Sequence, residues 1–292
     1  MKTCSSIIIA AILTLFIQSC AKDSKIDWEL QSHADLLVIE SLITSDSVFQ
    51  NVKLTLSNPY YDSKAPRTVS DAIVTISNGK KVYTFSESLD QKGLYSSQQK
   101  FGCKSGETYE LSIRLKDQVN SRSEYKSIAK MPPQGIVMDS IRCEIYEMPE
   151  FDFEEKDSKK EKDTTLLAVY YFGDEKKSSQ NYYFTKVYRN SKPLHDNARE
   201  FFATESQQEE GYTHVTTFNK NVADDDLITF KLYTVERGYY KYLEAIRNMD
   251  QTGMATSMSG PPANAVGNIP NALGYFVVAF ESVQTSKAID YR

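Results

Sequence analysis

Three histidines are the side chains in this sequence best suited to serve as a general base or a metal ligand, and they stand far apart. His33, His195 and His214 fall in separate segments. None belongs to a His-Glu-x-x-His pattern, which places two metal ligands on one face of a helix. The Gly-x-Ser-x-Gly turn, the Cys-x-x-Cys pair and the glycine-rich phosphate loop are also missing from the sequence. We therefore expect a non-enzymatic protein with no cofactor and no metal.

The strongest acidic cluster is Asp224-Asp225-Asp226. Clustered carboxylates suit calcium, but the glycine and the distant glutamate of an EF-hand loop do not follow. Aspartate also favours turns, and an apolar run begins at Ile228, so we expect a turn before a strand. A hydrolase with a dispersed carboxylate site is the third functional alternative, after the two binding functions described below.

Tyrosine is the one residue type whose abundance suggests recognition, with 19 in the chain. An amphipathic ring can stack on a sugar or cover a peptide. In a β-rich chain, however, one member of each adjacent tyrosine pair turns inward by alternation. Tyr60 and Tyr61 follow Pro59 in an expected loop, and we expect this pair to be exposed, which makes it the candidate contact with a partner or ligand.

The N-terminus has the pattern of a signal peptide. Lys2 supplies a positive charge, and Ile7 to Ile17 form an apolar stretch too short to span a bilayer permanently. Ile17-Gln18-Ser19-Cys20 resembles a bacterial lipobox, in which the cysteine is lipidated and becomes the mature N-terminus. The alternative is an ordinary signal peptide with an incidental cysteine. We expect residues 1–19 to be removed and Cys20 to carry acyl chains such as palmitate, which anchor the protein to a membrane.

Two cysteines remain after Cys4 is removed and Cys20 is lipidated. Cys103 and Cys143 would lie in an oxidising compartment, where a disulfide between them is possible. They could equally be independent small apolar side chains in two cores. The sequence leaves both alternatives open.

Alternating apolar residues predict a mainly β protein. Residues 20–33 are polar and suit a tether. Residues 34–132 contain seven predicted strands and suggest an immunoglobulin-like or transthyretin-like β-sandwich. The proline pair at Pro132 marks an expected boundary, and residues 133–292 predict a second, β-rich domain with one helix near 238–250. The predicted strands are 36–43, 52–56, 73–76, 82–85, 93–97, 109–115, 125–129, 137–146, 166–172, 182–188, 213–218, 228–235 and 273–280.

Charge and hydropathy exclude two classes of protein. The formal net charge is −5, which argues against a nucleic-acid partner that needs a basic face. After the signal segment, no run approaches the roughly 20 apolar residues of a transmembrane helix. The part of the chain after Cys20 is therefore expected to be tethered to the membrane rather than embedded in it.

Several short motifs together resemble a family of uncharacterised lipoproteins from Bacteroidota, catalogued as a domain of unknown function. The resemblance covers nearly the whole chain after Cys20 and rests on Leu37-Val38-Ile39-Glu40-Ser41-Leu42-Ile43, Leu54-Thr55-Leu56-Ser57 with Tyr60-Tyr61, Val69-Ser70-Asp71-Ala72, Gly93-Leu94-Tyr95, Met131-Pro132-Pro133, Asn268-Ile269 and Leu273-Gly274-Tyr275-Phe276. It implies an outer-membrane lipoprotein often encoded beside a TonB-dependent receptor, with no catalytic residues to carry over.

These observations give an ordered set of functional hypotheses. The first is an accessory lipoprotein that binds a TonB-dependent receptor or helps it capture a ligand. The second is an independent surface module that binds carbohydrate or peptide. Either protein would be lipid-anchored in the outer membrane, and its position on the periplasmic face or the cell surface stays open.

Overall fold

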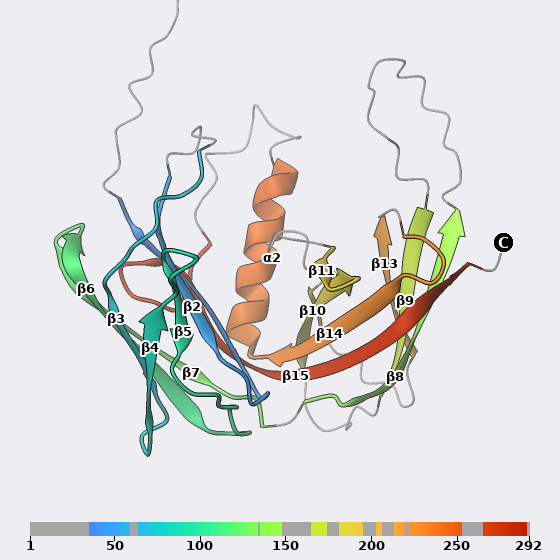
Figure 1. Cartoon of the computed structure of the whole chain (residues 1–292), viewed down its shortest axis with the longest axis horizontal. Coiled ribbons are helices and arrows are strands. Elements are labelled where there is room, and N and C mark those ends of the chain that lie inside the picture. The colour runs from blue at the N-terminus through green and yellow to red at the C-terminus, as the bar shows by residue number, and fades with distance from the viewer. Residues whose placement is uncertain are drawn as a thin grey trace, which may run out of the picture. The chain divides into compact units, whose positions relative to one another are not determined.

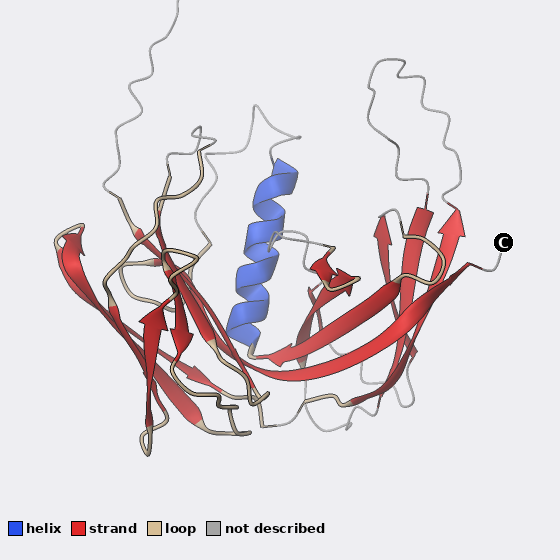
Figure 2. Ribbon diagram, viewed as in Figure 1, coloured by secondary structure: helices blue, strands red, loops and turns tan. Residues whose placement is uncertain are grey.

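The computed structural model describes residues 35–58, 64–133, 135–147, 165–173, 181–194, 203–205, 213–219, 222–252 and 265–290. Strands dominate this part of the chain, and the helix α2 accompanies them (Figure 2). The predicted mainly β fold is confirmed. The signal peptide and the tether lie outside the described residues.

The first half contains the seven predicted strands, which run antiparallel in the hydrogen-bonded order β1-β2-β5-β4-β3-β6-β7. Inward residues alternate with exposed ones, as the pleat requires, and the inward set forms the first core cluster. Leu37, Leu54 and Val74 are completely buried in it. The strands are β1 (Leu37–Thr44), β2 (Asn51–Leu56), β3 (Ile73–Ser77), β4 (Val82–Glu87), β5 (Leu94–Ser97), β6 (Thr108–Val119) and β7 (Arg122–Lys130).

The second half adds further strands and the helix (Figure 1). The sequence predicted all of them except β11 and β12, which are too short to show a period. They are β8 (Met138–Glu147), β9 (Thr165–Gly173), β10 (Tyr182–Arg189), β11 (Lys192–Pro193), β12 (Ala203–Glu205), β13 (Thr213–Asn219), β14 (Leu227–Val235), α2 (Arg237–Thr252) and β15 (Leu273–Asp290).

The last strand, β15, joins the two halves. Its first part pairs in parallel with β1, its middle pairs antiparallel with β14, and its end pairs in parallel with β8. Phe276 and Val278 belong to the first core cluster, whereas Ala288 belongs to a second cluster with β8, β9, β10 and β14. The strand therefore contributes side chains to two cores.

This arrangement corrects the expected domain division. Residues Asp35–Arg292 form one compact unit, so the predicted boundary at residue 133 does not separate two domains. The physical reason is the pairing of β1 with β15, in which Val38 lies beside Leu273. A pairing between strands so far apart in sequence leaves no trace in local periodicity.

The helix α2 packs on the β15 face opposite the first core. Tyr239 and Leu243, one turn apart, are buried there with Tyr275 and Val277. The Tyr239 ring lies 5.4 Å from Phe184 and 5.1 Å from Tyr275, centre to centre, in edge-on contacts. The predicted helix near 238–250 is confirmed.

The two cysteines considered for a disulfide are free and buried. Cys103 lies in the first core cluster and Cys143 in the second. Burial raises the pKa of both thiols to about 12, so both stay protonated at neutral pH. The structure therefore has two independent small side chains and no bond between them.

If β15 couples the two halves, removing its largest first-core side chain should destabilise both. Phe276 is fully buried, so we expect Phe276→Ala to lower the free energy of unfolding by about 3–5 kcal/mol in urea denaturation. Amides of β4 and β14 should lose protection from hydrogen exchange together. Val283→Ala, at a residue that is 38% exposed on the same strand, is the control and should cost less than about 1 kcal/mol. Loss of protection in β4 alone would contradict the coupling.

Candidate functional site

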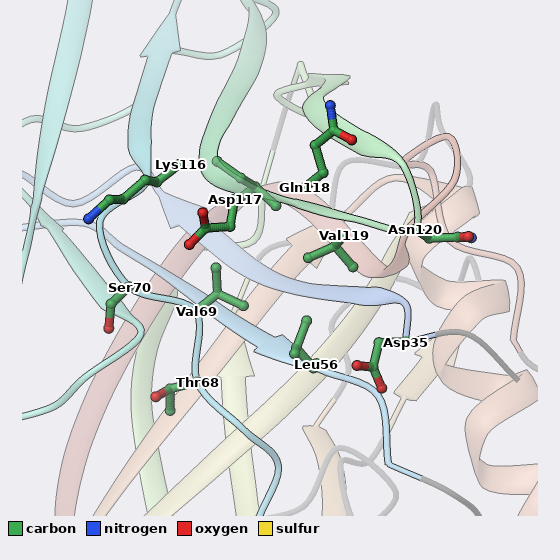
Figure 3. Close-up of a pocket in the computed structure, with 11 residues that line it drawn as sticks. Asp35, Leu56, Thr68, Val69, Ser70, Lys116, Asp117, Gln118, Val119 and Asn120 are labelled. Carbon is green, nitrogen blue, oxygen red and sulfur yellow. The ribbon is translucent and has the colours of Figure 1, made fainter. Parts of the chain in front are cut away.

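A cavity of 370 Å³ opens at one end of the first core. Its walls come from four segments: the start of the described chain, the end of β2, the residues just before β3, and the end of β6 (Figure 3). The lining consists of Asp35, Leu56, Thr68, Val69, Ser70, Leu115, Lys116, Asp117, Gln118, Val119 and Asn120.

The first wall of the cavity is a corner of the chain. Arg67 and Val69 hydrogen-bond β2, through Leu56 N to Arg67 O at 2.8 Å and Val69 N to Leu54 O at 3.1 Å. From Ile73 onward the chain pairs with β6 instead. The change of partner passes through Asp71, whose φ of 59° lies in the left-handed region. The segment Val69–Ala72 is called the corner below.

The hydroxyl of Tyr95 in β5 hydrogen-bonds both ends of the corner. It donates to the Val69 carbonyl at 2.8 Å and accepts from the Ala72 N–H at 3.0 Å. The residue is only 1% exposed, so water cannot readily replace it. One buried hydroxyl thus satisfies a backbone acceptor and a backbone donor on either side of the bend.

Glu87 of β4 holds the same corner through its carboxylate. Oε1 accepts from the Ser70 hydroxyl at 2.7 Å and from the Gly93 N–H at 2.9 Å, and Oε2 accepts from the Asp71 N–H at 3.3 Å. Burial acts to raise the pKa of this carboxyl, but the three donors and Lys92 together hold the pKa below its usual value. The carboxylate is therefore the form that stabilises the corner.

The second wall is the end of β6. Pairing with β3 stops at Arg114, opposite Ile73, and pairing with β7 is interrupted between Arg114 and Val119. The strand nevertheless continues to Val119 and then turns through Asn120 and Ser121, whose φ values of 48° and 62° suit a tight hairpin. The segment Leu115–Val119 is called the β6 overhang below.

Charges around the cavity are arranged as two ion pairs and one further carboxylate. Arg67 pairs with Asp35 at 2.6 Å, and Lys116 pairs with Asp71 at 3.2 Å. The Asp117 carboxylate has no such ion pair among the described residues. Figure 3 shows Asp117 and Val119 extending from β6 toward Val69 and Leu56. The cavity therefore combines an apolar surface with an acidic group, which suits recognition of a ligand that is partly apolar and partly basic.

Most of the predicted site residues, and two of the histidines considered and set aside above, lie outside the described part of the chain. This holds for Cys20, Tyr60, Tyr61, His33 and His195. The described chain stops at Asn58 and resumes at Lys64, and the Asn58 side chain donates to the Lys64 carbonyl at 2.6 Å. The expected contact role of Tyr60 and Tyr61 stays a prediction.

The aspartates at 224–226 form the expected turn. Asp225 has a φ of 66°, and Asp226 N donates to the Ala223 carbonyl at 3.2 Å. The Asp224 carboxylate accepts from Asp290 N at 3.0 Å, so it anchors the end of β15. Within the described residues no group of three His, Cys, Asp or Glu side chains is placed to hold a metal ion.

Another group of charges lies at the centre of the sheet. Lys231 Nζ lies 2.6 Å from Glu281 Oε1, which also accepts from the Tyr233 hydroxyl at 3.3 Å. Burial and the charge of Glu281 raise the pKa of nearby Asp46, although Lys231 opposes them. The backbone of Glu281 donates to the Ser45 hydroxyl at 2.9 Å. These contacts join β14 and β15 to the segment after β1, so their evident role is structural.

Removing the Tyr95 hydroxyl should weaken the corner. In Tyr95→Phe the Val69 carbonyl and the Ala72 N–H both lose a buried partner, at a cost of about 1–3 kcal/mol. Chemical denaturation monitored by circular dichroism gives the free energy of unfolding. Tyr146→Phe, at a residue that is 42% exposed, provides a matched loss of a hydroxyl and should cost less. Equal costs for the two variants would show that the corner does not depend on Tyr95.

Glu87→Gln should make the stability of the protein less dependent on pH in the acidic range. Because the pKa of folded Glu87 lies below its ordinary value of 4.5, its carboxylate stabilises the fold above that pH. This contribution disappears as pH falls through the lowered pKa. The difference in stability between the natural protein and the variant should therefore be largest at neutral pH and vanish in acid. A difference that grows as pH falls would contradict this account.

The properties of the helix and two comparisons with known proteins complete the description of the chain. None of the described helices is long and apolar enough to cross a membrane. A search of curated proteins finds no match. The sequence profile of one family, described as a domain of unknown function (DUF4249), matches residues 23–285 and thus spans the corner, the cavity and most of β15. The chain therefore belongs to the DUF4249 family.

Proposed function

We propose that this protein is a non-enzymatic, lipid-anchored accessory protein of the outer membrane that binds a membrane partner through the cavity. A TonB-dependent receptor is the partner class that the resemblance to Bacteroidota lipoproteins suggests. The observation that carries the proposal is the position of the cavity. Asp35, the first described residue, lines it.

The length of the tether supports this proposal. Asp35 follows Cys20 by fifteen positions, and a fully extended chain spans at most about 3.3–3.6 Å per residue. A lipid on Cys20 would thus keep Asp35 within about 50 Å of the membrane surface. Tethering at this range raises the effective concentration of the cavity toward any protein in the same membrane.

The chemistry of the cavity suits a protein segment as ligand. Leu56, Val69 and Val119 give an apolar contact area, and Asp117 adds a charge that fixes orientation. Side chains of this kind recognise a ligand and need no reacting group. They support a binding role for the site.

An independent carbohydrate- or peptide-binding lipoprotein is the second candidate function. The cavity volume of 370 Å³ favours it, because pockets for small ligands measure roughly 300–1,000 Å³. Such a protein would bind its ligand equally well after release from the membrane. The two functions therefore differ in their dependence on the anchor and on a second protein.

A photo-crosslinking amino acid at Gln118 should distinguish the two functions. Gln118 is exposed at the cavity, and we expect irradiation of cells to join it to one outer-membrane protein, identified by mass spectrometry after extraction through a tag at Arg292. The same amino acid at Lys80 is the control. Lys80 follows the far end of β3 and should give no such product.

Cys20→Ala tests the anchor in the same experiment. The variant should appear in the soluble fraction and lose most of the Gln118 product, because tethering no longer concentrates it at the membrane. If neither position gives a product while the unlabelled protein retains a small ligand, the independent binding function replaces the accessory one.

A further inference from the structure

The β6 overhang leaves one side of an extended strand without the neighbour that it has elsewhere. As far as Arg114, β6 lies between β3 and β7. At the corner the chain that forms β3 comes from beside β2, so β3 begins only at Ile73. No described strand continues the β3 side of β6 along Leu115–Val119. Exposed strand edges of this kind are templates for pairing with another chain.

We propose that the β6 overhang pairs with an extended peptide segment of a partner protein, which lies beside β6 where β3 is missing. This inference rests on the proposed function, because it names the part of the partner that the cavity receives. Main-chain hydrogen bonds would supply affinity, and the cavity would select side chains. The five residues of the overhang extend about 17 Å, enough for a short strand.

The cavity also specifies the side chains of this segment. Asp117 and Val119 are two positions apart and extend to the same side of β6, toward Val69 and Leu56 (Figure 3). Residues facing them across a strand pair would also be two positions apart. The Asp117 carboxylate favours a basic residue opposite it, and Val119 favours an apolar one. The expected motif is thus an apolar and a basic residue separated by one position.

The hydrogen bonds that hold the corner also maintain the cavity between the corner and the β6 overhang. Tyr95 and Glu87 hold Val69, Ser70, Asp71 and Ala72 by four hydrogen bonds, and Lys116 of the overhang pairs with Asp71 at 3.2 Å. Asp71 is the residue that would face Lys116 if the β3–β6 register continued. The ion pair therefore marks where the two segments separate, beside the last backbone pair of β3 and β6.

Binding of a blocked pentapeptide, Thr-Val-Thr-Lys-Thr, to the purified chain tests the proposal. Hydrogen exchange followed by mass spectrometry should show slower exchange at residues 115–119 in millimolar peptide. Thr-Val-Thr-Glu-Thr should bind about fivefold more weakly, because its acidic residue faces Asp117. A peptide methylated on its backbone nitrogens should give no protection, since it cannot donate main-chain hydrogen bonds.

A charge-reversal variant distinguishes a specific contact with Asp117 from general attraction between an acidic protein and a basic peptide. Asp117→Lys should reverse the preference, so that the glutamate peptide binds about fivefold more tightly than the lysine peptide. Asp90→Lys changes the net charge by the same amount at an exposed loop position and should keep the original preference. Unchanged preference in Asp117→Lys would overturn the assignment of Asp117.

The remaining outcomes are also decisive. Absence of protection at 115–119 with all unmethylated peptides, or equal protection by the methylated one, would overturn strand pairing. These results do not depend on the crosslinking experiment in cells. Protection without a crosslinked receptor would support the peptide site and contradict the proposal of a membrane partner. A crosslinked receptor without protection would support the partner and contradict strand pairing.

Discussion

Alternation of side chains along β15 is the constraint on which the rest of the structure depends. Successive residues of a strand face opposite sides of the sheet. Phe276 and Val278 therefore enter the first core, whereas Val277 and Ala279 belong to the cluster of buried side chains that includes Tyr239 and Leu243 of α2. Further along, Ala288 enters the second core. A shift of one residue in the pairing with β1 would reverse all of these positions at once. Gly274 fits this register because any Cβ there would lie 2.0 Å from the Ile39 carbonyl oxygen.

The cavity follows from how the first core ends. The segment before β3 pairs with β2, and β3 itself pairs with β6. The change of pairing partner takes place at the corner, where Asp71 adopts a positive φ. Tyr95 and Glu87 supply the hydrogen bonds that a regular ladder would otherwise provide. Two separate strands thus hold one short bend, and a cavity opens beside the bend.

Local sequence patterns predicted nearly every strand, because burial on one or both faces produces alternation or apolar runs. The prediction for β6 ended at Leu115, close to Arg114, where pairing with β3 ends. Lys116, Asp117 and Gln118 carry no apolar period, so the cavity wall was missed. The same reason explains why β15 was predicted to end at Phe280 although it continues to Asp290. The only available signal at the site was Asn120-Ser121, a turn pair directly after this polar run. The corner itself could not be predicted, because its hydrogen bonds to Tyr95 and Glu87 join separate strands.

Parallel pairing between the earliest and the latest strands has a consequence for how the chain is made. Val38 cannot meet Leu273 until almost the whole polypeptide has left the ribosome, and closing so long a loop is slow. The first core therefore lacks Phe276 and Val278 throughout synthesis. The order of the residues along the chain itself postpones completion of the first core until synthesis is nearly finished.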